Sequence, residues 1–342
     1  NVLFKPGPVK TESISVIDNF GSEGFEMELH HKGGFFMRAT GTKGDINQNG
    51  NISRHAKFGY KYLNDPSRIM KPMLKKGGKF KEISFEEAYE LIADRIKGVN
   101  PDENAFFAGA RLTNEEIYMV QKLARAGAKT NNINCFHYIG RGIGYGYNAM
   151  AAVPFEEIKK ASRIFVLGTD LHMDHPLVNH LIFDAHNRYN VPVELVTNNE
   201  NSGMKHKVDK VHDIKDFYYF VKAVNYFILS SGLQNQMFIN DRSVQFEEYK
   251  SKLMAEDFDD LFEKSGVCCI DELAQFAKDF NNEPNAILVF SEKEMSSNVS
   301  FELHNLAIIT GKMGKTAQGL IALKEKNNAQ GVIDMGGCHK IA

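Results

Sequence analysis

The chain has 342 residues, of which 43% are hydrophobic and 25% are charged, and its formal net charge is −2 at pH 7. This length and composition indicate a globular protein of two or three domains with enough apolar material for its cores. The near-neutral charge excludes the strongly basic footprint typical of a nucleic-acid-binding protein, so we expect no nucleic-acid partner.

The first 60 residues predict an irregular, β-rich segment. Polar and apolar residues alternate over 26–29 and 34–39, and glycines interrupt the pattern around these stretches. A basic run follows at 71–81. We interpret it as an exposed hairpin, because short runs of charge commonly form solvated surfaces.

From residue 84 onward the pattern changes to alternating helices and strands. Ser84 and Thr113 each precede a glutamate by three residues, which is the capping-box pattern of a helix start. Apolar runs predict strands at 104–109, 163–168, 191–197 and 286–290, and further helices are expected over 176–187, 213–230, 240–264, 270–279 and 298–310. This alternation predicts an α/β fold with parallel sheets that helices cover on both faces.

Three loops that follow predicted strands are the candidate binding segments, at 108–115, 168–176 and 196–201. In parallel sheets, ligands bind beyond the carboxyl ends of the strands. The first two loops lead into helix starts, whose free N–H groups attract anions. A phosphate or nucleotide-like ligand is therefore one interpretation, and an ordinary capped turn is the other.

Two weaker patterns suggest other chemistry. His172 and His175 lie beside Asp170 and Asp174, and imidazole with carboxylate suits zinc or iron, but no third ligand is in view. We therefore expect no metal there. The glycine-rich segment 140–146 lacks the ending of a phosphate-binding P-loop, and we interpret it as a turn before a helix.

The four cysteines, Cys135, Cys268, Cys269 and Cys338, form neither a disulfide framework nor a CxxC metal motif. This usage is typical of a reducing compartment, so we expect a cytoplasmic protein. Cys135 and His137 could form a nucleophile pair, but adjacency in sequence is not the geometry such a pair needs, and a buried cysteine is the favoured interpretation. No apolar run approaches the ~20 residues of a membrane-spanning helix, which predicts no direct membrane span.

Several ordered motifs resemble those of the molybdopterin oxidoreductases, a family that includes formate dehydrogenases, nitrate reductases and the large G subunit of respiratory complex I. The resemblance covers nearly the whole chain, and it rests on the order and spacing of the segments together. These segments are KFGY at 57–60, NDPSR at 64–68 with KP at 71–72, AGARLTNEE at 108–116 with QKLAR at 121–125, NNIN at 131–134, GTD at 168–170 with HP at 175–176, LAIITGKMG at 306–314, and NNAQG at 327–331 with DMG at 334–336.

The resemblance implies a fold of two parallel-sheet, Rossmann-like domains and a small β-rich N-terminal domain. We expect the β-rich domain, a degenerate iron–sulfur region, over 1–62. One α/β domain would combine 63–150 with 278–342, and a second, over 151–277, would be inserted between them. Catalytic relatives continue well beyond the DMG motif, so we expect the chain to be truncated at its C-terminus and to be an excised part of a longer protein.

The chain departs from the family where an iron–sulfur cluster is usually bound. Relatives place four cysteines near the start, and the corresponding positions here are Ile17, Phe20, Gly24 and Ser53. Because these clusters need thiolate ligands, we expect the cluster to be lost from this region. His55 corresponds to the basic residue thought to relay electrons from that cluster to the pterin.

A second departure concerns the catalytic metal. Relatives ligate it through a cysteine or selenocysteine shortly after the NN-containing turn, a position that is about Gly140 here, or Cys135 if a gap is allowed. Glycine offers no side-chain ligand to a soft metal, so we expect no catalytic residue, no metal ligand and no bound cofactor. These losses favour a non-catalytic scaffold domain in the peripheral arm of NADH:quinone oxidoreductase, as part of the large G subunit of complex I. It would be cytoplasmic and peripheral to the inner membrane through its partner subunits, with electron transport carried by cofactors elsewhere.

The alternative is a pterin-binding molybdenum or tungsten oxidoreductase of the formate dehydrogenase type, toward which the wording of the motifs leans. In that case, residues of the strand-end loops and of the NNAQG motif would bind molybdopterin: Arg111, Thr113, Gly168, Thr169, Asp170, His175, Asn198 and Gln330. A plain nucleotide-binding module is a third interpretation, and it rests on the strand-end loops alone.

Overall fold

The computed structural model of the chain describes residues 9–44, 47, 49–139 and 152–338. The chain divides into two compact units, which we treat separately. Unit 1 consists of Asn1–Phe20, Gly24–Ile139 and Asn328–Ala342, and unit 2 of Gly21–Glu23 and Gly140–Asn327.

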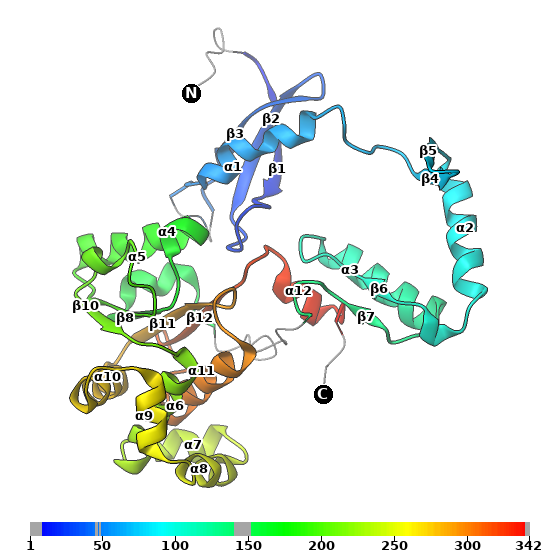
Figure 1. Ribbon diagram of the computed structural model, residues 1–342. Helices are drawn as coiled ribbons and strands as arrows, with labels where there is room; N and C mark the ends of the chain where they lie inside the picture. The colour runs from blue at the N-terminus through cyan, green and yellow to red at the C-terminus, as the bar shows by residue number, and fades with distance from the viewer. Residues whose placement is uncertain (1–8, 45–46, 48, 140–151, 339–342) are drawn as a thin grey trace. The chain divides into compact units, whose positions relative to one another are not determined.

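A five-stranded parallel sheet forms the centre of unit 2 (Figure 1). Its order is β10-β9-β8-β11-β12, and every neighbouring pair is parallel. The strands are β8 (Arg163–Leu167), β9 (Val193–Thr197), β10 (Lys210–Asp213), β11 (Ala286–Ser291) and β12 (Gly319–Leu323). All residues of β9 and β11 are buried, as expected for strands covered on both faces.

Helices cover the two faces of this sheet with separate cores. Along β8, Phe165 and Leu167 belong to one core together with side chains of α6, α10 and α11, whereas Ile164 and Val166 belong to the other core together with side chains of α5. This alternation follows from the two-residue period of a strand. Among the described residues of unit 2, the helices are η5 (Phe155–Lys160), α4 (Leu171–Asp174), α5 (Pro176–Tyr189), η6 (Lys205–Lys207), α6 (Phe217–Ser230), α7 (Gln236–Arg242), α8 (Phe246–Met254), α9 (Phe258–Ser265), α10 (Ile270–Asn282) and α11 (Ser297–Thr310).

Unit 1 begins with a small antiparallel sheet. Strands β1 (Glu12–Ile17), β2 (Glu26–Lys32) and β3 (Phe35–Gly41) pair in sequence order, and Met27, Leu29 and Ala39 pack against Ala56 and Tyr60. Those last two residues belong to α1 (Arg54–Gly59) and to the 3-10 turn η1 (Tyr60–Asn64).

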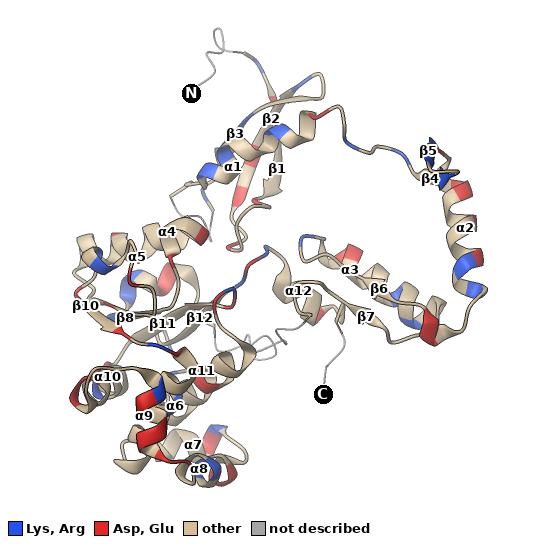
Figure 2. Cartoon of the chain, viewed as in Figure 1, with Lys and Arg blue, Asp and Glu red and all other residues tan. Residues whose placement is uncertain are grey.

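The rest of unit 1 is helical with short strands. The hairpin β4 (Met73–Lys76) and β5 (Lys79–Glu82) turns at Gly77 and Gly78 and carries lysines on both strands (Figure 2). It is followed by α2 (Phe85–Lys97), η2 (Pro101–Glu103), β6 (Phe106–Phe107), α3 (Asn114–Lys122), the π-helical turn η3 (Leu123–Gly127), β7 (Ile133–Asn134) and α12 (Ala329–Asp334).

The structure confirms the α/β fold class and many of the predicted elements. Ser84 Oγ accepts from Glu87 N at 3.1 Å at the start of α2, and Thr113 forms a complete capping box with Glu116 at the start of α3. The basic run at 71–81 contains the predicted hairpin. The segment 240–264 contains separate helices, and β1, β10 and β12 were not predicted. β10 reads KVHD, which is too short and too polar to give a strand signal.

The predicted division of the chain differs from the observed one. We expected 278–342 to join 63–150, but β11 and β12 complete the sheet of β8, β9 and β10, and only the segment from Asn328 onward belongs to unit 1. Sequence order does not reveal that β11 pairs with β8, because parallel strands are joined by long crossovers. In unit 1, parallel pairing among the described residues is limited to β6 with β7, two residues each, where a second Rossmann-like sheet was expected.

Phe276 tests the core that lies between the sheet of unit 2 and the helices α6, α10 and α11. Its ring is 1% exposed and lies 5.4 Å from that of Phe165 and 5.1 Å from that of Phe220. We expect Phe276→Ala to lower the free energy of unfolding by about 3–5 kcal/mol. Phe301→Ala, at a 49% exposed position on α11, should change it by less than about 1 kcal/mol. Because the chain has no tryptophan, urea unfolding would be followed by circular dichroism. Equal losses in the two variants would contradict the assigned core.

Candidate functional site

The order of the sheet in unit 2 creates a topological switch point between β8 and β11. From β8 the chain adds β9 and β10 on one side, and then returns to add β11 and β12 on the other. The loops at the carboxyl ends of β8 and β11 therefore lead away in opposite directions, and in open α/β sheets such a switch point is where ligands bind. The predicted residues Gly168, Thr169, Asp170 and His175 all follow β8 and lie at this point.

Gly168 ends β8 in a left-handed conformation, with a φ of +65°. A Cβ atom added there would lie 2.4 Å from Met295 Cε and 2.7 Å from Phe217 Cζ, so the position requires glycine for space as well as for conformation. The next residue, Thr169, is 2% exposed, and its buried Oγ1 has no hydrogen-bond partner among the described residues. A buried hydroxyl without a partner costs about 1–3 kcal/mol, which a ligand could offset.

His175 joins the loop after β8 to the end of β11. Its Nδ1 lies 3.1 Å from Ser22 Oγ, and its Nε2 lies 3.2 Å from Ser291 Oγ, the last residue of β11. Burial lowers the pKa of His175 to about 4, so the ring is neutral at pH 7. One nitrogen of a neutral imidazole donates and the other accepts, and a serine hydroxyl can take either role.

Charged pairs between the loops surround this histidine. Lys293 Nζ donates to Asp174 Oδ1 at 2.6 Å, which joins the loop after β11 to α4. Lys324 Nζ donates to Glu292 Oε1 at 2.7 Å, and both side chains are nearly buried. Burial raises the pKa of Glu294. These two lysines are thus each paired with a carboxylate, and the loops are fixed to one another.

Asp170 is bound to the loop after β9, and the neighbouring polar side chains also have partners within the protein. Ser202 Oγ donates to Asp170 Oδ1 at 3.0 Å. Asp174 pairs with Lys293, and the ring nitrogens of His175 face serine hydroxyls. In these contacts Asp170, Asp174 and His175 point to different partners, and they form no common set of metal ligands.

Asn198, the predicted residue after β9, is exposed at the same carboxyl edge. It lines a surface hollow of about 470 Å³ together with Glu200, Lys205, Asp213 and Lys215. The three remaining predicted residues belong to unit 1, where each has a local partner. Arg111 Nε donates to Asn19 O at 2.9 Å, Thr113 caps α3, and Gln330 Nε2 donates to Asp334 Oδ1 at 2.9 Å.

Asn328 was not predicted, although it belongs to the quoted NNAQG motif. Its Nδ2 donates to Leu112 O at 2.7 Å and to Asn114 Oδ1 at 3.0 Å, and its N–H donates to Ala110 O at 3.0 Å. Asn328 therefore fixes the start of α12 to the loop before α3. Ser22 and Ser291 were also missed, because they lie 153 and 116 residues from His175 in sequence.

The positions that correspond to cluster cysteines hold a hydrogen-bonded loop. Ser53 Oγ accepts from Ala56 N at 2.9 Å and lies 3.3 Å from Asp18 Oδ2, while Asp18 Oδ1 accepts from Phe20 N at 2.8 Å. Gly24 forms a left-handed turn, and Ile17 is 49% exposed. None of these side chains carries a thiol, so the residues do not fit an iron–sulfur cluster.

The resemblance links three further positions to redox chemistry: His55, Cys135 and Gly140. His55 lines an exposed hollow with Arg54, Phe58 and Lys61. Cys135 is 2% exposed, and burial raises the pKa of its thiol, which disfavours the thiolate that a metal or a nucleophile needs. Gly140 and the glycine-rich segment 140–146 lie outside the described residues.

Comparison with known proteins decides the family. The family model described as "Molybdopterin oxidoreductase" matches residues 68–336. The chain belongs to the molybdopterin oxidoreductase family. Acetylene hydratase from Pelobacter acetylenicus has a similar fold, with a TM-score of 0.69 over 90% of this chain and 42% of that one, at 14% sequence identity. This likeness concerns the fold alone.

Curated relatives of this family member carry the names of formate dehydrogenases. The "F420-dependent formate dehydrogenase 2 subunit alpha" of Methanococcus maripaludis is 27% identical over 307 residues, which cover 84% of this chain and 44% of that protein. A Staphylococcus aureus protein with a provisional formate dehydrogenase name is 27% identical over 300 residues, or 82% of this chain and 30% of its own length. The chain thus spans less than half the length of these relatives.

These relatives overturn the predicted role as a non-catalytic scaffold of NADH:quinone oxidoreductase. Their names support the alternative, a molybdopterin oxidoreductase of the formate dehydrogenase type, and nothing in them indicates complex I or quinone. The prediction was wrong because it rested on missing cysteines, although the wording of the remaining motifs leans toward the formate dehydrogenase type. Among the described helices, none is both long and apolar enough to cross a membrane.

The buried histidine predicts a defined acid sensitivity. An ordinary histidine with a pKa of about 6.5 binds a proton in the unfolded chain, whereas His175 binds it only near pH 4 when folded. The unfolded state therefore holds more protons between these values, and the free energy of unfolding should fall by roughly 3 kcal/mol as the pH drops from 6.5 to 4.

His175→Gln removes this titrating group, so we expect a shallower decrease over the same pH range in urea unfolding followed by circular dichroism. His180→Gln, at an exposed position of α5, the helix that follows His175, is the matched control and should keep the slope of the natural chain. A slope unchanged by His175→Gln would contradict the buried, neutral state of His175.

Proposed function

We propose that this chain is the pterin-binding part of a molybdenum or tungsten oxidoreductase of the formate dehydrogenase type, and that the switch point of unit 2 contacts the cofactor. The observation that carries the proposal is the buried hydroxyl of Thr169, which has no partner among the described residues and follows the glycine that ends β8. The family match and the formate dehydrogenase names of the relatives support it.

The residues at the switch point fit a flat, polar heterocycle. The left-handed glycine Gly168 lets the side chains of Met295 and Phe217 pack against the main chain where β8 ends, which fixes the start of the loop that carries Thr169. Thr169 Oγ1 can donate one hydrogen bond and accept others. The neutral ring of His175 fixes the loop to β11 and adds no charge to the switch point.

In this proposal the chain binds and orients, and the cofactor carries the redox chemistry. When bound, the metal of a molybdopterin supplies the two-electron step, and the protein determines where the substrate meets it. No cysteine occurs in 168–176, 196–203 or 291–296, so we assign the metal no protein thiolate at this site. Asn198 and the unit 1 residues Arg111, Thr113 and Gln330 remain proposed contacts of lower weight, because each unit 1 side chain already has a local partner.

Partners are part of the same proposal. The Methanococcus maripaludis relative is named as an alpha subunit. The cluster positions of this chain hold no thiols, so electrons from the cofactor would leave through another part of the protein or through a partner subunit.

Pterin content tests the proposal. We expect protein purified from a host that makes molybdopterin, with its natural partners, to release a fluorescent oxidised pterin on acid treatment and to reduce an artificial electron acceptor with formate. Thr169→Val keeps the shape of the side chain and removes the hydroxyl, so it should lower pterin occupancy about tenfold. Because that hydroxyl is buried without a partner among the described residues, the cofactor-free variant should be at least as stable to heat as the natural chain.

Thr310→Val is the matched control, because the hydroxyl of Thr310 is also buried but donates to Leu306 O at 2.6 Å within α11. It should leave pterin occupancy unchanged. Natural protein without pterin would contradict the proposed function. Full occupancy in Thr169→Val would contradict the role of Thr169 alone.

A further inference from the structure

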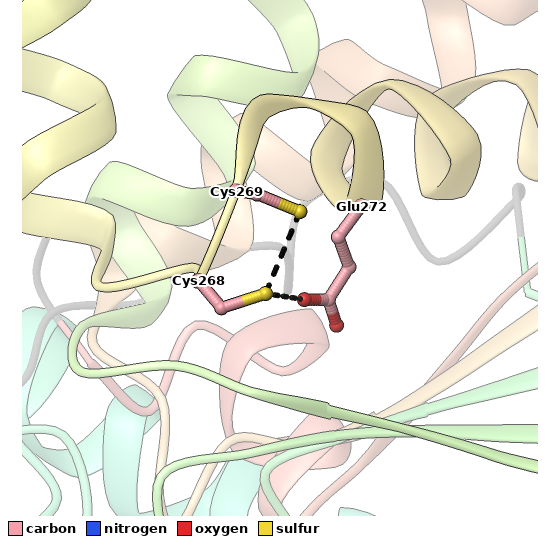
Figure 3. Close-up of side chains that lie close together, drawn as sticks. All are labelled: Cys268, Cys269 and Glu272. Carbon is pink, nitrogen blue, oxygen red and sulfur yellow. Dashed lines mark hydrogen bonds between the residues drawn. The ribbon is translucent and has the colours of Figure 1, made fainter.

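A second polar cluster lies on the surface of unit 2 and shares no residue with the switch point. Cys268 and Cys269 form part of the short link from α9 to α10, and Cys269 is the N-cap of α10 (Figure 3). The two sulfur atoms are 3.5 Å apart, and Cys268 Sγ lies 2.8 Å from Glu272 Oε2. The three ligand atoms all lie within 4.8 Å of one another, and both cysteines are exposed.

The link that presents these cysteines is fixed at its start. Gly266 ends α9 in a left-handed conformation with a φ of +72°, and a Cβ there would lie 2.4 Å from Lys215 Cγ. The N–H of Lys215 donates to Ser265 O at 2.8 Å. The chain therefore leaves α9 in a defined direction, and the side chain of Val267 is buried before the two cysteines emerge.

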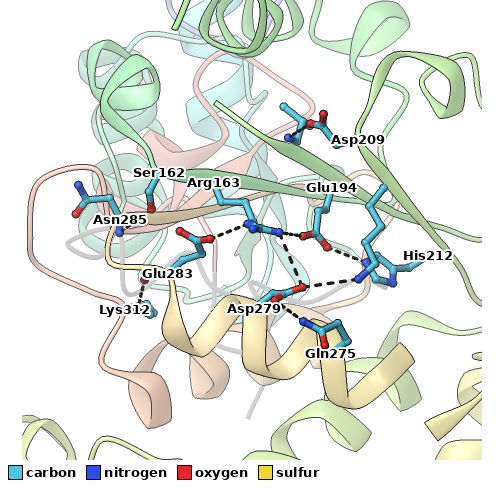
Figure 4. Close-up of polar contacts among 12 residues, drawn as sticks. Ser162, Arg163, Glu194, Asp209, His212, Gln275, Asp279, Glu283, Asn285 and Lys312 are labelled. Carbon is cyan, nitrogen blue, oxygen red and sulfur yellow. Dashed lines mark hydrogen bonds and ion pairs between the residues drawn. The ribbon is translucent and has the colours of Figure 1, made fainter. Parts of the chain in front are cut away.

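A buried chain of polar residues orients the carboxylate of this cluster. Figure 4 shows its members Arg163, Glu194 and His212. Glu272 Oε1 lies 3.0 Å from His212 Nδ1, and His212 Nε2 lies 2.8 Å from Glu194 Oε2. His212 and Glu194 are each 1% exposed, and Glu194 is also paired with Arg163. Burial alone would raise the pKa of Glu194, but the hydrogen bonds from His212 and Arg163 outweigh it and lower that pKa.

The arrangement resembles the support of a metal ligand. One oxygen of Glu272 is fixed from the protein interior, and the other faces the two sulfurs at the surface. Carboxylates that bind metals are oriented in this way by neighbouring groups, which typically contribute 10–100-fold to metal affinity. Hydrogen bonding to Glu272 and Cys269 raises the pKa of Cys268 to about 12, so a bound cation must displace the proton of this thiol.

We propose that Cys268, Cys269 and Glu272 form a zinc-binding site, with a water molecule at the fourth position. Zinc binds thiolate sulfur at about 2.3 Å and carboxylate oxygen at about 2.1 Å in a tetrahedral arrangement, so its ligand atoms lie about 3.6–3.8 Å apart. The observed separations of 2.8 and 3.5 Å, with none above 4.8 Å, require shifts of about 1 Å at most.

The chemistry of binding selects the ion. Each thiol loses its proton to solvent, two Zn–S bonds and one Zn–O bond form, and no electron is transferred. Thiolates prefer zinc to the hard cations magnesium and calcium, so the site should discriminate against those ions. The site uses none of the residues proposed to contact the pterin, so the zinc proposal can be tested independently of the proposed function.

Metal titration of the reduced full chain tests the site. Under anaerobic conditions with a non-thiol reductant, Zn²⁺ would be titrated in competition with a chromophoric chelator, and Co²⁺ would report thiolate ligation by its absorption. We expect one tightly bound zinc per chain, no competition from Mg²⁺, and loss of this zinc in the double variant Cys268→Ser/Cys269→Ser. Zinc should also protect both cysteines from alkylation.

Substitutions of Glu272 and of His212, which orients it, test their contributions to zinc affinity. Glu272→Gln and His212→Gln should each weaken zinc binding 10–100-fold. Asp271→Asn is the matched control, because Asp271 is an exposed carboxylate in the same first turn of α10 but lies outside the cluster, and it should leave zinc affinity unchanged. If His212→Gln does not fold, the partly exposed Glu272 still provides the test.

Three results would overturn the proposal. The first is a reduced chain that binds no stoichiometric zinc. The second is zinc that persists in the double cysteine variant. The third is a Cys268–Cys269 disulfide that survives the reductant, recognised by a mass two hydrogens lower than that of the dithiol.

Discussion

The parallel pairing of β8 with β11 is the constraint on which the rest of unit 2 depends. It places the end of β8 beside the end of β11, although β9, β10 and the helices α4 to α10 lie between the two strands in sequence. His175 fixes this arrangement through hydroxyls on either side of its ring. At this switch point the hydroxyl of Thr169 is buried without a partner among the described residues, and it is the strongest indication of a ligand in this part of the chain.

Local sequence patterns predicted the loop after β8, but they did not predict the residues that hydrogen-bond to His175 in that loop. An apolar run that ends in glycine marks the end of a buried strand, so Gly168, Thr169 and His175 could be named from sequence. Their partners could not, because Ser22 and Ser291 reach the site only through the tertiary fold. The same limit applies to the proposed zinc site: two adjacent cysteines match no metal motif, and His212 lies 60 residues before Glu272. Strand β10 was missed because it is short and polar, and yet it carries the histidine that orients Glu272.

The absence of thiols at Ile17, Phe20, Gly24 and Ser53 concerns the β-rich segment alone, and it does not indicate what the rest of the chain binds. Ser53 and Asp18 hold the loop at these positions through hydrogen bonds. Treating that absence as the loss of all redox function gave the wrong assignment, because unit 2 keeps its strand-end loops whatever the β-rich domain binds. Two thiols lie instead at the start of α10, where a buried network of charged residues supports the carboxylate beside them.

The central claim is that the switch point of unit 2 contacts a pterin. A crystal or electron cryo-microscopy structure of the protein purified from its natural source with its partners tests it most directly. The account predicts density for a pterin beyond the carboxyl ends of β8 and β11, with a polar atom of the cofactor within hydrogen-bond distance of Thr169 Oγ1. A pterin bound elsewhere, or a water molecule alone paired with that hydroxyl, would contradict it.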